Sequence, residues 1–312
     1  MKRYFIGRIF AVIPTLLGIT FIAFCLGILS PGNPAEIALS QGGYQPSPAQ
    51  IQAMEVTMGL DQAYGVQYLQ WMKKIVQGDL GKSYASNRPV AEEIRRRLPM
   101  TLKLSAYAFL LTCVLGLGLG ILSAWHKDTK VDYVIMTGLN AVLSLPGFWV
   151  GLILILVFAE TLKWLPTSGY GGVKHMILPA LTLSSAAGAT IARVTRGALM
   201  AEFGKSYYTA AMTRGLSQWQ LVVCNALPNA LGPILPMIGN YLGGILGGAV
   251  VVESIFAIPG LGSYALGAIS SKDYPALQAY VLMTGLVYVI ISLGVDLLGL
   301  WISPKVRLGE NQ

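Results

Sequence analysis

Six long apolar runs set the strongest limit on how this chain can fold. They cover residues 9–29, 104–125, 133–159, 176–192, 228–252 and 274–295. A helix of about 20 apolar residues crosses a hydrocarbon core of about 30 Å. Because lipid offers no hydrogen-bond partners, a spanning segment must satisfy its own backbone, which a helix does alone. The sequence therefore predicts an all-α membrane protein with six transmembrane helices.

The composition agrees with a membrane protein and restricts the partners. Apolar residues make up 54% of the chain, charged residues 12%, and the mean hydropathy is +0.61. The net charge of +8 is then a property of the loops, so we expect no nucleic-acid partner. The first run exceeds the apolar core of a cleavable signal, which predicts a retained helix. The fourth run is short and must continue past Arg193 and Arg196 to cross the bilayer.

A polar stretch separates the first apolar run from the other five. Residues 30–99 hold six of the fourteen acidic residues and are too polar to enter lipid. Glycine and proline punctuation predicts three short helices there, one from Pro48, one over 67–76 and one over 89–97. We therefore divide the chain into residues 1–99, a first helix plus a soluble insertion, and residues 100–312, a five-helix core.

Lysine and arginine in the short loops predict the orientation. If the N-terminus is cytoplasmic, eleven of these residues fall inside and three fall outside, and long loops count little. The inner ones are Lys2, Arg3, Arg8, Lys127, Lys130, Arg193, Arg196, Lys205, Arg214, Lys305 and Arg307, and the outer ones Lys163, Lys174 and Lys272. Both termini and residues 203–228 are then cytoplasmic, and the insertion is extracytoplasmic.

Residues 203–228 have the pattern of a helix, a turn and a second helix. Four residues recur at helical spacing: Phe203, Tyr207, Ala210 and Ala211. Gly215 stands where a left-handed C-terminal cap is expected, and Ser217 with Gln220 has capping-box spacing. Pro228 is expected to bend or end the second helix. A hairpin that only packs on its own bundle is the alternative to a docking element.

The spacing of residues 210–228 resembles the EAA loop of ABC importer permeases. Ala210-Ala211, Gly215 and residues 225–228 match it, while Thr209 stands at the usual acidic position and Asn225 at a usual apolar one. Motifs of the peptide/nickel branch of this family lie at 60–61, 66–68, 78–83, 89–90, 97–102, 252–262, 268–269, 273–275, 296–298 and 304–307. Directly before the last motif, Ser303 stands where the family usually has an acidic residue. The resemblance covers nearly the whole chain.

This resemblance implies a type I ABC importer permease fold in a bacterial inner membrane. It implies four kinds of partner: a second homologous permease, two ATPase subunits, an extracytoplasmic substrate-binding protein and the lipid bilayer. The ATPase-coupling residues would be Tyr207, Tyr208, Thr209, Ala210, Ala211, Gly215, Leu216, Leu227 and Pro228. The translocation path and its outer gate would include Gly243, Gly247, Glu253, Phe256, Pro259 and Gly260. We expect Tyr207, Tyr208, Ala211 and Leu216 to face the ATPase.

The sequence lacks the residues of a nucleotide, metal or catalytic site. Gly81-Lys82-Ser83 ends like a P-loop, but Val76 replaces the required first glycine. His126 and His175 are the only histidines, and the three cysteines lie in or beside apolar runs. No Ser/His/Asp set or carboxylate pair converges on one face. We therefore predict a non-enzymatic subunit that binds no cofactor, with ATP and Mg²⁺ used by partner subunits.

Small residues mark two runs for close helix contact. Gly116 and Gly120 on the second run, and Gly239, Gly243, Gly244, Gly247 and Gly248 on the fifth, have the spacing that lets backbones approach. A path-lining role and tight packing inside one bundle explain this pattern equally well.

Ionisable residues within the apolar runs are few. Glu160 and Glu253 fall at outer ends, and Asp296 is expected to pair with Arg193 or Arg196. A carrier driven by an ion gradient usually has carboxylates near the membrane midplane, so we favour ATP-driven alternating access. The outer loop at 164–172, which leads into 175–179, is short and resembles that of nickel-type permeases, which favours nickel, as a chelate, over the alternative of di- or oligopeptides. A secondary carrier or channel is the remote alternative.

Overall fold

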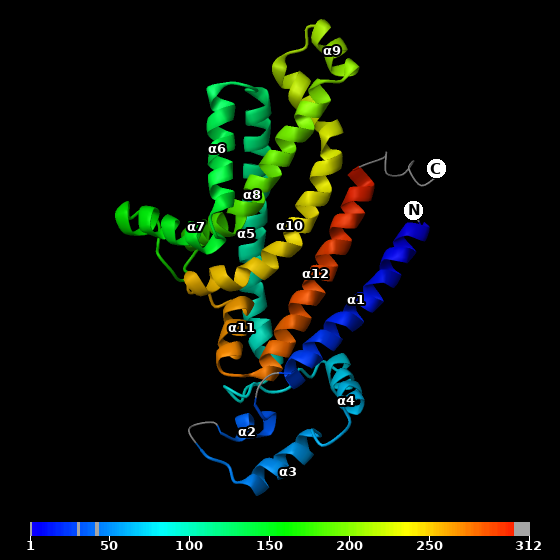
Figure 1. Ribbon diagram of the computed structural model, residues 1–312, viewed down its shortest axis with the longest axis vertical. Helices are drawn as coiled ribbons and strands as arrows, with labels where there is room; N and C mark the ends of the chain where they lie inside the picture. The colour runs from blue at the N-terminus through cyan, green and yellow to red at the C-terminus, as the bar shows by residue number, and fades with distance from the viewer. Residues whose placement is uncertain (1, 30–31, 41–43, 303–312) are drawn as a thin grey trace. The chain divides into compact units, whose positions relative to one another are not determined.

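The computed structural model describes residues 2–29, 32–40 and 44–302, with side chains described over 10–29, 32–40 and 44–295. Within them the chain is helical, without a β-strand (Figure 1). The helices are α1 (Lys2–Leu29), α2 (Pro34–Leu39), α3 (Pro48–Met58), α4 (Tyr64–Val76), α5 (Val90–Trp125), α6 (Lys130–Ser144), α7 (Gly147–Leu154), the π-helix η2 (Ile155–Thr161), α8 (Val173–Phe203), α9 (Ser206–Thr213), the π-helix η3 (Gln220–Ala226), α10 (Leu227–Ile255), α11 (Leu261–Ser270) and α12 (Tyr274–Ile302).

Five helical stretches are long and apolar enough to cross a membrane. They are Phe10–Leu29, Val90–Trp125, Val173–Phe203, Gln220–Ile255 and Tyr274–Val295. The pair Lys130–Ser144 and Gly147–Thr161 gives a sixth if the two count as one bent span. The expectation of an all-α protein with six spans is confirmed in this sense.

The third span is bent where the sequence predicted a continuous helix. The chain bends by 110° between α6 and the α7–η2 segment. Leu145 has an extended backbone, with φ −96° and ψ 141°, directly before Pro146. The proline ring disfavours the helical conformation of the residue before it and removes a backbone donor. Hydropathy over 133–159 carries no information about this bend.

Two other helices test expectations drawn from the sequence. α8 continues unbroken for 31 residues past Arg193 and Arg196, so the expected extension of the fourth run is confirmed. The separate helix predicted over 89–97 is wrong, because those residues are the first turns of α5, which passes through Pro99. A proline within a helix is tolerated where neighbouring groups satisfy the freed carbonyl.

The chain divides into two compact units. Unit 1 comprises residues 1–101 and 259–290, and unit 2 comprises residues 102–258 and 291–312. In unit 1 the start of α5 packs on α11 and α12 through a small core of Val90, Ile94, Leu261 and Ala279. Unit 1 therefore joins the N-terminal third of the chain to a segment about 170 residues away.

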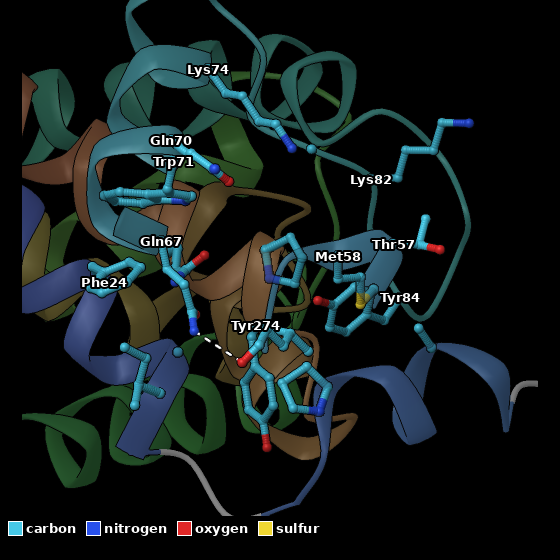
Figure 2. A pocket seen from close by; sticks show the side chains of 18 of the residues that line it. Phe24, Thr57, Met58, Gln67, Gln70, Trp71, Lys74, Lys82, Tyr84 and Tyr274 are labelled. Carbon is cyan, nitrogen blue, oxygen red and sulfur yellow. Dashed lines mark hydrogen bonds between the residues drawn. The ribbon is translucent and has the colours of Figure 1, made fainter. Parts of the chain in front are cut away.

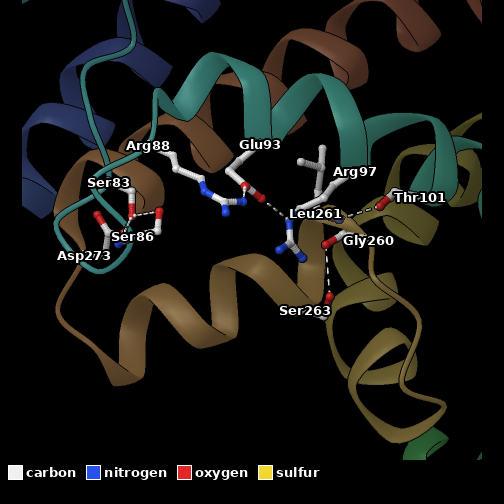
Figure 3. Close-up of polar contacts among 10 residues, drawn as sticks. All are labelled: Ser83, Ser86, Arg88, Glu93, Arg97, Thr101, Gly260, Leu261, Ser263 and Asp273. Carbon is white, nitrogen blue, oxygen red and sulfur yellow. Dashed lines mark hydrogen bonds and ion pairs between the residues drawn. The ribbon is translucent and has the colours of Figure 1, made fainter. Parts of the chain in front are cut away.

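Polar contacts strengthen this joint in unit 1 (Figure 3). The buried carboxylate of Asp273 accepts hydrogen bonds from Ser83 Oγ at 2.5 Å and from the Tyr84 amide at 3.0 Å. Along α5, Arg97 pairs with Glu93 at 3.0 Å and lies 4.8 Å above the Tyr264 ring. These groups link motifs that lie far apart in the sequence.

Unit 2 is organised around α8, which packs against α6, α7 and α10. A Cβ on Gly116 would stand 2.7 Å from Ile191 Cγ2, and a Cβ on Gly120 would stand 2.6 Å from the Ala192 carbonyl oxygen. Glycine at these two positions is therefore what lets α5 lie directly against α8, as their spacing predicted.

Candidate functional site

The 203–228 hairpin has the local structure that its sequence predicts. Gly215 follows α9 with φ +74°, and its amide donates to the Met212 carbonyl at 3.0 Å. Ser217 and Gln220 form the capping box, with the Ser217 amide 3.0 Å from Gln220 Oε1 and the Gln220 amide 3.3 Å from Ser217 Oγ. The left-handed turn and the new helix start are thus confirmed.

The second helix of the hairpin begins as a π-helix and does not end at Pro228. η3 leads directly into α10, so Pro228 stands within a continuous helix, where its ring removes one backbone donor without ending the helix. The Asn225 side chain donates to the Gln220 carbonyl at 2.8 Å, and the Asn229 side chain donates to the Asn225 carbonyl at 2.8 Å. An amide at 225, where the family usually has an apolar residue, therefore satisfies a carbonyl of the wider π-turn.

Glu202 anchors α9 to the end of α8. This buried carboxylate accepts from Lys205 Nζ at 2.7 Å and from the Tyr207 hydroxyl at 2.7 Å. Burial and the Glu202 carboxylate raise the pKa of Tyr207 to about 12, so the hydroxyl remains a donor at physiological pH. These contacts fix the angle at which the hairpin leaves α8.

The expected outward face of the hairpin is partly wrong. Tyr208 is 6% and Ala211 9% exposed, because both pack into a core with α5, α8 and η3. Tyr207 and Leu216 are half-buried against the same core, as is Leu227. The Tyr208 ring lies 4.7 Å from Phe203. An apolar face of a helix packs wherever apolar partners are nearest, and here the bundle itself supplies them.

Other hairpin side chains remain exposed. Five of the exposed residues lie on α9 or in the turn that follows it: Thr209, Ala210, Met212, Thr213 and Arg214. Trp219 and Pro228 are exposed as well, with Trp219 6.0 Å from the Trp125 ring. Residue type alone could not separate this rim from the buried face, because both contain small and apolar residues.

The six expected path and gate residues fall in different units. In unit 2, Gly243, Glu253 and Phe256 are buried, whereas Gly247 is exposed and a Cβ there would meet nothing within 4 Å. The Phe256 carbonyl accepts from the Gly169 amide at 2.9 Å.

Unit 1 holds the other two of these six residues. Pro259 and Gly260 precede α11, whose first amide, from Leu261, donates to Thr101 Oγ1 at 2.8 Å (Figure 3). The turn after α10 is thus held within unit 1 by a buried threonine of α5.

An ion pair in unit 2 was not anticipated from the sequence. Arg196 on α8 donates to both carboxylate oxygens of Asp132 on α6, at 2.8 and 2.7 Å. Asp132 also accepts from Ser123 Oγ at 2.5 Å and the Asp128 amide at 3.1 Å. We had expected Arg193 or Arg196 to pair with Asp296. The side chain of Asp296 lies outside the described residues, and Arg196 is engaged by Asp132.

Family models match almost the entire chain. Residues 116–308 match the binding-protein-dependent transport system inner membrane component, and residues 1–105 match the N-terminal region of such membrane components. The chain belongs to this family. It is an ABC importer permease, a subunit of transport rather than an enzyme, whose family implies partner ATPases and a binding protein. The permease is therefore an integral protein of the inner membrane.

Curated relatives of the permease cover it nearly end to end. The dipeptide transport system permease protein DppB of Alkalihalophilus pseudofirmus is 35% identical over 98% of this chain and 100% of its own. The glutathione transport system permease protein GsiC of Pectobacterium atrosepticum is 37% identical, covering 98% and 99%. The probable D,D-dipeptide transport system permease protein DdpB of Escherichia coli is 34% identical, covering 98% and 97%.

A solved structure agrees on the fold. A chain of the MetNI methionine ABC transporter in an inward-facing conformation matches with a TM-score of 0.59 at 17% identity, over 68% of the permease and 96% of that chain. This likeness supports the ABC transporter permease fold.

Nickel as cargo finds no support among these relatives. We favoured it because the outer loop at 164–172 is short, yet the relatives above are named for dipeptides and glutathione. Within the described residues, no group of three or more His, Cys, Asp and Glu side chains is arranged to hold a metal ion.

Proposed function

We propose that this permease forms half of a path that imports di- or oligopeptides by alternating access. The observation that carries the choice of cargo is the identity of 34–37%, over 98% of the chain, to permeases named for dipeptides and glutathione. The second half of the path is a homologous permease. A substrate-binding protein delivers the peptide from outside.

The energy comes from two separate ATPase subunits, which hydrolyse ATP with Mg²⁺ and grip the cytoplasmic hairpins. The exposed rim of the 203–228 hairpin, with Thr209 and Ala210 at its centre, enters a groove of the ATPase. Tyr208 and Ala211 act from within, because they attach the hairpin to α5, α8 and η3. Movement of the ATPase is thus transmitted to α8 and α10 rather than lost in a loose loop.

The movement also reaches α10 through residues that join α9 to its first turns: Tyr207, Leu216, Leu227 and Pro228. In the path itself, Gly247 offers an open backbone surface to the peptide. Glu253, Phe256, Pro259 and Gly260 belong to the outer gate, and Gly243, which is buried in α10, belongs to the path.

Substitution of Gly215 tests the coupling role. Its φ of +74° strains any β-branched residue, while open space around the position leaves no steric clash. We expect Gly215→Val to insert normally but to lower peptide uptake at least tenfold while ATP hydrolysis continues. Gly215→Asn is the matched control, since asparagine tolerates a left-handed backbone. Normal uptake by the valine variant would contradict the coupling role.

The cargo is tested with the cognate binding protein and with uptake into cells. We expect di- and tripeptides to bind the binding protein and to enter cells in a manner that requires this permease. Free and chelated nickel serve as comparison ligands. Binding of a nickel chelate without peptide binding would overturn the peptide assignment and leave the permease mechanism intact.

A further inference from the structure

Unit 1 contains a cavity whose lining includes none of the coupling, path or gate residues named above. Its volume is ≈860 Å³, and it lies among α1, α3, α4, the 79–87 loop and the start of α12 (Figure 2). Protein sites for small ligands typically enclose 300–1,000 Å³, with apolar walls and a few placed polar groups. We propose that this cavity binds a short peptide by its two charged ends. The choice of ligand rests on the proposed function.

Aromatic side chains form the walls of the cavity. On one side the rings of Phe24 and Trp71 lie 5.7 Å apart, joining α1 to α4. On the other, Tyr84 and Tyr274 meet edge to face at 6.4 Å, joining the 79–87 loop to α12. Contacts between aromatic rings hold these walls at fixed positions. Flat, rigid walls of this kind suit side chains of varied shape.

Two of the three carboxylates in the lining already accept a hydrogen bond from the protein. Glu55 accepts from Asn33 Nδ2 at 2.5 Å, and Asp79 accepts from the Gly81 amide at 2.9 Å. The third, Asp61, has no hydrogen-bond or ion-pair partner among the described residues, and the same holds for the ammonium group of Lys74. The Lys74 side chain extends from α4 toward the space beside Met58 and Tyr84, whereas Lys82 points outward (Figure 2).

Lys74 and Asp61, both without a partner among the described residues, line the same cavity, and their opposite charges match a zwitterion. Lys74 would bind the terminal carboxylate of the peptide and Asp61 its terminal ammonium, each as a charge-assisted hydrogen bond. A nucleotide or other polyanion would meet three carboxylates in the same lining. The chemistry therefore selects an unmodified peptide over an anionic ligand.

Neutral polar groups supply contacts for the peptide backbone. Gln67 Nε2 donates to the carbonyls of Leu60 at 3.1 Å and Gln62 at 2.7 Å, which leaves Oε1 as an acceptor. Burial beside Asp273 and Tyr274 raises the pKa of Tyr84 to about 12, so its hydroxyl keeps its proton at physiological pH. A protonated hydroxyl and an amide oxygen provide a donor and an acceptor that no charge competes for.

The predicted extracytoplasmic location of the cavity suggests what such a site would do. The cavity is built mainly from residues 33–87, which the charge pattern of the short loops predicts to be extracytoplasmic. A peptide leaving the binding protein would meet this cavity before the membrane path. The inference is a receiving site on the permease itself, distinct from the site on the binding protein.

Direct binding to the full-length permease in lipid nanodiscs tests this proposal without ATPase or binding protein. The probe is radiolabelled Ala-Phe, with the C-terminally amidated and the N-acetylated dipeptides as competitors. We expect saturable binding of Ala-Phe, and each blocked dipeptide to compete about tenfold less well, because each loses one charged contact. Lys74→Gln should abolish the preference over the amide, and Asp61→Asn the preference over the acetylated form.

Lys73→Gln is the matched control, since Lys73 neighbours Lys74 on α4 but does not line the cavity. Thr57→Trp, which fills the cavity from its rim, should remove binding while the thermal unfolding temperature stays within a few degrees. Absence of saturable binding, or equal binding by the Lys74→Gln and Lys73→Gln variants, would overturn the receiving site. Peptide uptake by cells that carry those variants would show that the proposed transport function stands even so.

Discussion

At the scale of single residues, the Arg196–Asp132 pair is the most consequential contact that the sequence does not reveal. Arg196→Ala would leave a carboxylate that is 7% exposed without its bidentate partner. Removing one member of a buried pair costs about 3–5 kcal/mol. Because Arg196 is itself a quarter exposed, we expect a loss of about 2 kcal/mol in unfolding free energy.

Thermal unfolding in nanodiscs measures this loss. Arg193→Ala is the control, because Arg193 is exposed on the same helix and has no ion pair among the described residues. Arg196→Lys should fall between the two, since lysine keeps the charge but cannot bind both oxygens. Equal unfolding temperatures for the Arg193 and Arg196 alanine variants would show that the pair contributes nothing.

Two neighbouring tyrosines allow a test of the anchor on the hairpin. Tyr207→Phe removes the hydroxyl that donates to Glu202. Tyr208→Phe removes a hydroxyl that makes no hydrogen bond among the described residues. We expect the first change to cost about 1 kcal/mol locally, and therefore to speed amide exchange over residues 205–213 about fivefold. Tyr208→Phe should leave exchange unchanged. Equal exchange in both variants would contradict the anchoring role of the Tyr207 hydroxyl.

At the scale of helices, Gly120 and Gly118 differ by their surroundings alone. A Cβ at Gly120 would stand 2.6 Å from a backbone oxygen of α8, which cannot move aside as a side chain can, whereas a Cβ at Gly118 meets nothing within 4 Å. Gly120→Ala should therefore destabilise the permease by about 2 kcal/mol. Gly118→Ala should stabilise it by up to about 1 kcal/mol, because alanine favours helix. Thermal unfolding shifts of the same sign would contradict this packing.

Helix ends set by neighbouring residues could be predicted, and bends set by tertiary context could not. Gly215 and the Ser217–Gln220 box act within four residues, so their sequence is enough. Pro99 and Pro146 look alike in the sequence, yet α5 passes through the first and the chain turns by 110° at the second. The difference lies in the groups that surround each proline in the folded protein, and these tertiary contacts cannot be read from the sequence.

At the scale of the whole molecule, hydropathy predicted the number of spans because bilayer thickness fixes helix length. The division into units could not be predicted in the same way. Asp273 binds the amide and hydroxyl groups of residues 83–85 across about 190 positions, and that contact brings residues 259–290 into unit 1. The burial of Tyr208 and Ala211 likewise depends on contacts with α5 and η3 that form only when the chain folds.

The remaining whole-molecule prediction is orientation, which places the receiving cavity and the 203–228 hairpin on opposite sides of the membrane. Gln52→Cys and Thr213→Cys provide exposed reporters on α3 and α9, in a background where Cys25, Cys113 and Cys224 are replaced by alanine. We expect a membrane-impermeant maleimide to label the first reporter in intact spheroplasts and the second only after permeabilisation. The reason is that the predicted inner loops hold eleven Lys and Arg residues and the outer short loops three. Short loops rich in Lys and Arg stay on the cytoplasmic side during insertion. Labelling of Thr213→Cys in intact spheroplasts would invert the topology, remove the hairpin from the reach of any ATPase and place the cavity where no binding protein could deliver to it.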